Sequence, residues 1–305
     1  MTQQTFRLPA TVTSPSLFVR RQPRIGSPVV LYVHGATFPS ALSVGFDFGG
    51  GSWLDDWNAR GFDAWAFDFA GFGESDRYAA MSEPAGRNPP LCRAPEAARQ
   101  VAAVLDLIGR ETGPERVSLV AHSWGGAPAA LAAIAQPERI DRLVLFAPIA
   151  RRTGGAVPAS LPAWADITNE AQYKRFNEDV PKGQAPVLEG FDRWAPAYLA
   201  SDPGAAARMP PAVRVPYGPA TDNIKARAGG LAWDPARITR PLAIVRGAWD
   251  SLCLDTDAAT ILDAATTVPS RHDCKLDAGT HLMHLETGRH ALYDAVGRAL
   301  KGETP

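Results

Sequence analysis

One serine stands at a tight junction between a buried strand and a helix. The stretch "VSLVAHSWGGAPAALAAIAQPERI", residues 117–140, carries an aliphatic segment, then "AHSWGG", then an alanine-rich segment with helical spacing. A sharp strand-to-helix turn projects a serine hydroxyl above a sheet when its neighbours are small. Gly125 and Gly126 are small, and Ala121 stands at the first small position. We therefore interpret Ser123 as a nucleophile, with an ordinary N-capping serine as the alternative.

A serine hydroxyl needs a base before it can attack, and the chain has six histidines. His281 and His284 lie in "KLDAGTHLMHLE", after a predicted strand. We prefer His281, because the small residues before it let a loop carry it back over the serine, whereas His284 is expected to pack near the helix start. Asp250, just beyond the strand in "PLAIVRGAWD", is predicted to orient the base. Asp255 and Asp257 are instead explained by the first turn of the next helix.

The same chemistry needs donors for the negative charge that develops on a carbonyl oxygen. The predicted strand "VVLYV" ends in "HGATFPSA", so the backbone N–H of Ala36 or Thr37 is a candidate. The N–H of Trp124, directly after the serine, is the second candidate. The loss of one such donor typically costs about two to three orders of magnitude in rate.

These residues require a sheet that brings strand ends together. Short apolar segments, each bounded by turn residues, are "SLFVRR", "PVVLYVHG", "FDAWAFDFAGFGESD", "VSLVA", "LVLFAP" and "PLAIVRG". Helical patterns alternate with them, as in "RAPEAARQVAAVLDLIGRETG", where Pro95 stands near the start and Gly113 at the end. Such an alternation predicts an α/β fold with a parallel sheet covered by helices on both faces.

About 90 residues of different character interrupt this alternation, which exceeds the usual length of a connection in α/β units. We predict a core made of residues 1–150 and 241–305, and an insertion of residues 151–240, rich in proline and aromatic residues. The insertion is expected to be mainly helical and to form a cap, or lid, over the carboxyl edge of the sheet, where ligands bind in such folds. The alternative is a separate small domain with its own core.

The motifs "YVHGA", "FDFAGFGESD", "VAHSWGG", "RGAWD" and "AGTHLMHLE" resemble, in the same order, those of the α/β-hydrolase family. The resemblance implies a mostly parallel eight-stranded sheet whose first strands are antiparallel, and a serine mechanism without a cofactor. The chain order Ser123, Asp250, His281 is the order expected for that family. Its haloalkane dehalogenases and epoxide hydrolases carry an aspartate at the nucleophile position, so the serine argues against those reactions.

The predicted function is that of a carboxylesterase-like serine hydrolase that cleaves an ester, thioester, lactone or amide of a small acyl compound. The apolar part of the substrate is expected to lie against the aromatic residues of the insertion. "HSWGG" is also similar to the proline iminopeptidase type, although "HGATFPSA" replaces its glycine- and proline-rich oxyanion motif. The sequence is also compatible with a hydrolase of carbon–carbon bonds, an acyltransferase, a perhydrolase or a non-catalytic ligand-binding protein.

Composition narrows the possible partners. There are 31 Lys and Arg against 32 Asp and Glu, for a formal net charge of -1, which argues against nucleic acid and anionic membranes as partners. No long apolar run or signal peptide is evident, and the three cysteines are scattered without metal-type spacing. We expect a cytoplasmic protein with reduced thiols and no metal or cofactor. The oligomeric state is not indicated.

Overall fold

Eight strands form one sheet in the order β1-β2-β4-β3-β5-β6-β9-β10. The structure is a computed structural model that describes residues 3–113, 115–184 and 190–305. The strands of this sheet are β1 (Gln4–Leu8), β2 (Leu17–Gln22), β3 (Val29–Val33), β4 (Asp63–Asp68), β5 (Val117–His122), β6 (Ile140–Phe146), β9 (Leu242–Gly247) and β10 (Arg271–Leu276). β2 pairs antiparallel with β1 and β4, and all other pairs are parallel. The predicted mostly parallel eight-stranded sheet is confirmed.

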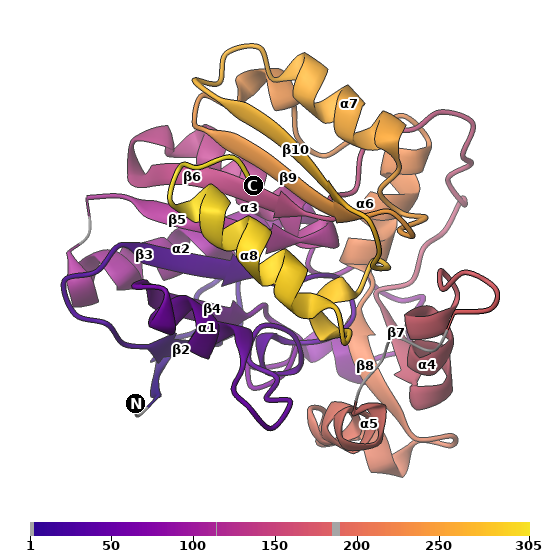
Figure 1. Ribbon diagram of the computed structural model, residues 1–305. Coiled ribbons are helices and arrows are strands. Elements are labelled where there is room, and N and C mark those ends of the chain that lie inside the picture. Colours follow the sequence, from indigo (N-terminus) through magenta and orange to yellow (C-terminus); the bar gives the residue numbers. More distant parts are fainter. Residues whose placement is uncertain (1–2, 114, 185–189) are drawn as a thin grey trace.

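Helices cover both faces of this sheet, and the alternation of residues along β3 reflects the two faces. Val30 and Tyr32 belong to one buried cluster, and Leu31 and Val33 belong to the other. The helices of the core are α1 (Trp53–Ala59), α2 (Ala94–Thr112), α3 (Gly126–Ala135), α7 (Asp255–Ala264) and α8 (Arg289–Leu300). α1 and α8 lie in front of the sheet in Figure 1, and α2 and α3 lie behind it.

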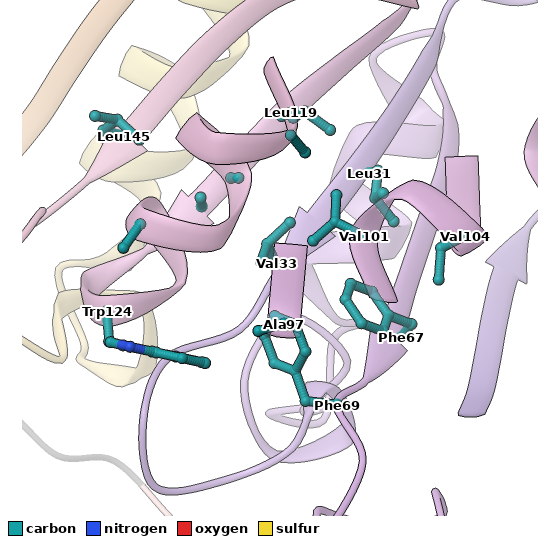
Figure 2. Close-up of a cluster of buried hydrophobic side chains, with 14 of the residues drawn as sticks. Leu31, Val33, Phe67, Phe69, Ala97, Val101, Val104, Leu119, Trp124 and Leu145 are labelled. Atoms are coloured by element: carbon teal, nitrogen blue, oxygen red, sulfur yellow. The ribbon is translucent and has the colours of Figure 1, made fainter. Parts of the chain in front are cut away.

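The longest helix, α2, follows directly from its sequence. Pro95 lies in its first turn and Gly113 ends it in the left-handed conformation, with φ of 57°. Val101 and Val104 are fully buried on the stripe that faces the sheet (Figure 2). Burial of each such side chain stabilises the fold by roughly 2 kcal/mol. In the part of the chain that the structure describes, no helix is both long and apolar enough to cross a bilayer.

Between β6 and β9 the chain leaves the main sheet. It forms β7 (Trp164–Thr168), α4 (Asn169–Asn177), α5 (Phe191–Ala200), β8 (Ala212–Pro216) and α6 (Gly218–Arg227). β7 and β8 form an antiparallel sheet of their own, which was not predicted from the sequence. An ion pair joins them, because the Nε of Arg214 donates to Asp166 at 2.9 Å. Four of these elements, β7, β8, α4 and α5, gather beyond one end of the main sheet (Figure 1).

Aromatic side chains join the insertion to the core. Trp194 of α5 packs edge-on against Phe38, with ring centroids 5.3 Å apart, and its Nε1 donates to the carbonyl oxygen of Leu42 at 2.9 Å. Phe176 and Tyr198 pack around the same indole. All three insertion residues belong to the cluster that continues under the main sheet. This part of the insertion therefore shares its hydrophobic core with the rest of the molecule.

Candidate active site

Ser123 follows the last residue of β5 in a strained turn. Its φ is 54°, in the left-handed region that residues other than glycine rarely adopt, and it begins a 3₁₀ turn that leads into α3. Such a conformation costs on the order of 1–3 kcal/mol and persists only where its surroundings enforce it. Gly125 permits the turn, because a Cβ there would lie 2.4 Å from the carbonyl oxygen of His34. Only a glycine allows α3 and the end of β3 to approach this closely.

The structure brings the predicted nucleophile, base and carboxylate together from three separate loops. The Nε2 of His281 lies 2.7 Å from the Oγ of Ser123. The Nδ1 of His281 lies 2.9 Å from one carboxylate oxygen of Asp250 and 3.1 Å from the other. All three residues are buried, with 3–5% of their surface exposed. In this geometry the serine can donate its proton to the imidazole while the carboxylate accepts from the opposite nitrogen.

Asp250 is held as a carboxylate. Burial would raise its pKa, but the charge of His281, the bond from that imidazole and the backbone N–H of Leu252 together lower the pKa below its usual value. The Oδ1 of Asp250 accepts from the N–H groups of Leu252 and Cys253 at 2.8 and 3.1 Å. This carboxylate therefore has fixed donors besides the imidazole and can hold one tautomer of His281.

The loops that carry the base and the carboxylate are tied together. The N–H of Trp249 donates to the carbonyl oxygen of Gly279 at 3.1 Å. Glu286 accepts from the backbone N–H of Thr280, the residue before His281, at 3.0 Å. Burial raises the pKa of Glu286. These contacts fix the two residues that directly precede His281.

The predicted oxyanion donors lie at the ends of neighbouring strands. β3 runs beside β5, with Val33 opposite Ala121, so the segment after β3 meets the turn at Ser123. Gly35 lies so close to the turn that a Cβ there would be 2.9 Å from the Nδ1 of His122. Ala36 and Thr37 follow in the same segment, and both are half-buried. Trp124 is 1% exposed and follows the serine directly.

The other two histidines near the site serve as neutral packing groups. The Nε2 of His122 donates to the carbonyl oxygen of His281 at 3.0 Å, and its ring stacks on Phe146. The Nε2 of His284 lies 3.0 Å from the Oγ of Ser43. Burial lowers the pKa of His122 well below its usual value and lowers the pKa of His284 to about 3. His284 thus faces Ser43, and the structure does not bring it to Ser123.

A small cavity lies beside Ser123. Its volume is about 10 Å³, enough for about one water molecule. Its apolar lining comes from the core and the insertion and consists of Trp124 and five aliphatic residues: Ala127, Ile149, Ala226, Leu231 and Ala232. The sequence pattern instead predicts aromatic residues of the insertion at this place. The aromatic residues Phe176, Trp194 and Tyr198 pack in the shared core.

A larger groove lies elsewhere. It has a volume of about 680 Å³ and runs between the segment after β3 and the end of α5, past Leu42, Phe46 and Ala200. It contains none of the predicted site residues. The polar geometry at Ser123, rather than cavity size, therefore identifies the candidate active site.

Sequence reasoning missed one charged residue at this site. Asp222 of α6 accepts from the indole Nε1 of Trp124 at 3.0 Å and borders the same cavity as Ser123. It lies in the insertion, 98 positions from Trp124. No motif marks it in the sequence. Among the described residues, no three His, Cys, Asp or Glu side chains are grouped as metal ligands would be.

Comparison with protein families gives one match. The model of the α/β hydrolase fold matches residues 28–260, which include Ser123 and Asp250. No curated protein sequence matches the chain.

Solved structures share the fold at low sequence identity. A thioesterase domain from the curacin biosynthetic pathway is 14% identical, with a TM-score of 0.62 over 99% of this chain and 100% of that chain. A hydrolase from Pseudomonas aeruginosa is 21% identical, with a TM-score of 0.60 and 98% of both chains covered. An epoxide hydrolase from Vigna radiata is 15% identical, with a TM-score of 0.63 and 98% of both chains covered. At these identities the likeness concerns the fold alone.

Proposed function

Because the chain belongs to the α/β hydrolase fold family, we propose that it is a serine hydrolase acting on a carboxylic ester, thioester, lactone or amide. The observation that carries the proposal is the continuous set of contacts from Ser123 through His281 to Asp250, at 2.7 and 2.9 Å. A hydroxyl, an imidazole and a carboxylate at such distances form the arrangement that activates a serine for acyl transfer.

In the proposed reaction, the Oγ of Ser123 attacks the carbonyl carbon while the Nε2 of His281 takes its proton. The carbonyl oxygen becomes an oxyanion, stabilised by the N–H of Trp124 and by that of Ala36 or Thr37. The C–O, C–S or C–N bond then breaks, and His281 returns the proton to the leaving group. A water molecule, deprotonated by the same nitrogen, releases the acid from the acyl-enzyme.

The proposed substrate is a small acyl compound, and the reaction needs neither a metal nor an organic cofactor. The cavity of about 10 Å³ beside Ser123 leaves little room on that side of the serine, so the acyl group we propose is short. Aryl acetates are therefore the first substrates to test.

A fluorophosphonate probe tests the proposal directly, because it reacts with an activated serine. We expect labelling of the wild-type protein at Ser123, located by peptide mass spectrometry. Ser123→Ala should lose labelling and lower kcat for an aryl acetate by at least about 10³-fold, since the three residues act as a unit. Its circular dichroism spectrum should remain that of the folded protein. A folded wild-type protein that is not labelled, or a variant that keeps its activity, would contradict the proposal.

A further inference from the structure

We propose that Asp222 is a positioning residue for the oxyanion hole, which acts from the insertion by holding the side chain of Trp124. The inference rests on the proposed function, in which the backbone N–H of Trp124 stabilises the oxyanion. It adds to that function a residue that no catalytic motif contains.

Asp222 is almost completely buried and its carboxylate is fully engaged. Its side chain is 3% exposed, and it forms an ion pair with the Nε of Arg93. The same carboxylate accepts from the backbone N–H of Ala94 at 2.7 Å and from the indole N–H of Trp124 at 3.0 Å. Three donors from two core segments therefore converge on one insertion residue, and each bond fixes the direction of the others.

The element that carries Asp222 is itself docked on the core. α6 begins at Gly218, whose N–H donates to the carbonyl oxygen of Leu91 at 2.8 Å. A Cβ at Gly218 would lie 2.2 Å from that same oxygen, so the start of the helix rests directly on the core backbone. Asp222, one turn further on, thus holds the indole from a fixed support.

The indole needs this support because its backbone adjoins the strained residue. Ser123, with φ of 54°, tends to relax toward an ordinary conformation, and any rotation there would redirect the N–H of Trp124. The indole is anchored by the ring of Phe69, whose centroid lies 5.3 Å away (Figure 2), and by the hydrogen bond to Asp222. Loss of the polar anchor leaves only apolar packing to oppose this rotation.

The negative charge of Asp222 also has to be compatible with an oxyanion nearby. Arg93 neutralises it through the ion pair, and the amino end of α2 adds a partial positive charge through Ala94. The carboxylate of Asp222 is therefore a rigid acceptor for the indole N–H, and Arg93 and the start of α2 offset its negative charge.

The test compares Asp222→Asn, Trp124→Phe and the double variant. Trp124→Phe removes the indole N–H and keeps the backbone N–H. The readouts are the rate constant for fluorophosphonate labelling of Ser123, and kcat and KM for p-nitrophenyl acetate, each per folded protein. We expect each single variant to lose about tenfold in labelling rate and kcat, part of the 10²–10³-fold effect of removing a whole donor. KM should stay within about twofold, and the double variant should also lose only about tenfold.

Asp202→Asn is the matched control. Asp202 is a buried carboxylate of the insertion that accepts from Arg208 at 2.6 Å and from the N–H groups of Gly204 and Arg214 at 2.9 and 2.8 Å. We expect this variant to lower the melting temperature without changing the labelling rate.

Several outcomes would overturn the proposal. The first two are labelling rates that stay unchanged in both single variants, and labelling that becomes faster because the insertion is loosened. The other two are a hundredfold loss of labelling rate in the double variant, and a loss in Asp202→Asn equal to that in Asp222→Asn. If Asp222→Asn does not fold, an unchanged rate in Trp124→Phe is by itself sufficient to overturn it. A wild-type protein that does not react with the probe would instead remove the proposed function itself, so the two failures are distinguishable.

Discussion

At the scale of single residues, the environment of each histidine decides its role. His281 contacts both a hydroxyl and a carboxylate, so its Nε2 can take the serine proton while the carboxylate holds the other ring nitrogen. His122 and His284 lie nearby, with ring centroids 4.6 Å apart, but burial keeps both neutral, and among the described residues neither bonds to a carboxylate. Of these three histidines, His281 is thus the candidate base, and the other two are packing groups.

Replacing His281 or His284 should separate these roles. His281→Ala is expected to lower kcat/KM for an aryl acetate by at least about 10³-fold. His284→Ala should lower the free energy of unfolding by about 2 kcal/mol through the cavity it leaves, and change kcat less than about tenfold. Steady-state kinetics and urea unfolding measure the two effects. Equal losses of activity in both variants would contradict the assignment of His281 as the base.

Sequence reasoning singled out Ser123, Asp250 and His281, which the structure brings together, because each follows a predicted strand in a recognisable local pattern. It could not find Asp222, whose partners Arg93 and Trp124 lie 129 and 98 positions away in the chain. Polar and apolar residues are mixed along α6, so no local feature of the sequence indicates that this aspartate is buried. Its position becomes evident only when α6 is docked on the core.

At the scale of elements, the site depends on how closely neighbouring elements approach. The 3₁₀ turn after β5 touches the end of β3 at Gly125, and the loops after β9 and β10 touch at Gly247 and Gly279. At Gly247 a Cβ would lie 2.1 Å from the carbonyl oxygen of Gly279. Small residues therefore set the distances between the segments that carry the proposed nucleophile, base, carboxylate and oxyanion donors.

Gly125→Ala should disturb this arrangement. Its Cβ would lie 2.4 Å from the carbonyl oxygen of His34 and 2.7 Å from that of Val33. Relief requires the end of β3 to move, so we expect a loss of about 1–3 kcal/mol in stability. The same movement should lower kcat by at least about tenfold, because Ala36 and Thr37 follow that strand. Urea unfolding and steady-state kinetics measure both effects.

Gly126→Ala is the neighbouring control. Its Cβ would meet only the Cδ2 of Leu145 at 3.3 Å and the Cβ of Pro148 at 3.8 Å. Flexible side chains can yield by a few tenths of an ångström, and alanine favours the helix that begins there. We expect stability within about 1 kcal/mol and kcat within about twofold of wild type. If both alanine variants behaved alike, close approach at Gly125 would not explain the geometry.

Six strands of the main sheet, β2, β3, β4, β5, β6 and β9, could be predicted from their apolar segments, but its edge strand β1 and the separate strands β7 and β8 could not. β7 contains no fully buried residue, so it lacks the alternation that identifies a half-buried strand. Its pairing is stabilised instead by polar contacts, since the guanidinium of Arg214 lies 3.3 Å from the ring centroid of Trp164 and pairs with Asp166. Such contacts between distant segments leave no periodic pattern in the sequence.

At the scale of the whole molecule, burial of polar groups near the site links stability to pH. Folding holds His122 and His284 neutral, whereas in the unfolded chain each titrates near pH 6.5. Below that pH the unfolded state binds protons that the folded state does not, so stability falls as the solution becomes more acidic. The lowered pKa of Asp250 also makes stability fall on acidification, but only at more acidic pH. The raised pKa of Glu286 has the opposite effect and makes stability rise on acidification.

The contribution of His284 can be isolated from these other groups by a difference. From pH 7.5 to 5.5, one histidine held neutral should remove roughly 1.3 kcal/mol of unfolding free energy. His284→Gln keeps a polar side chain opposite Ser43 but does not titrate. We expect this variant to be less stable at pH 7.5 and to lose about 1.3 kcal/mol less than wild type on acidification, as measured by urea unfolding at both pH values. An equal pH dependence in the two proteins would mean that His284 binds a proton in the folded state, and that its burial beside His122 does not keep it neutral.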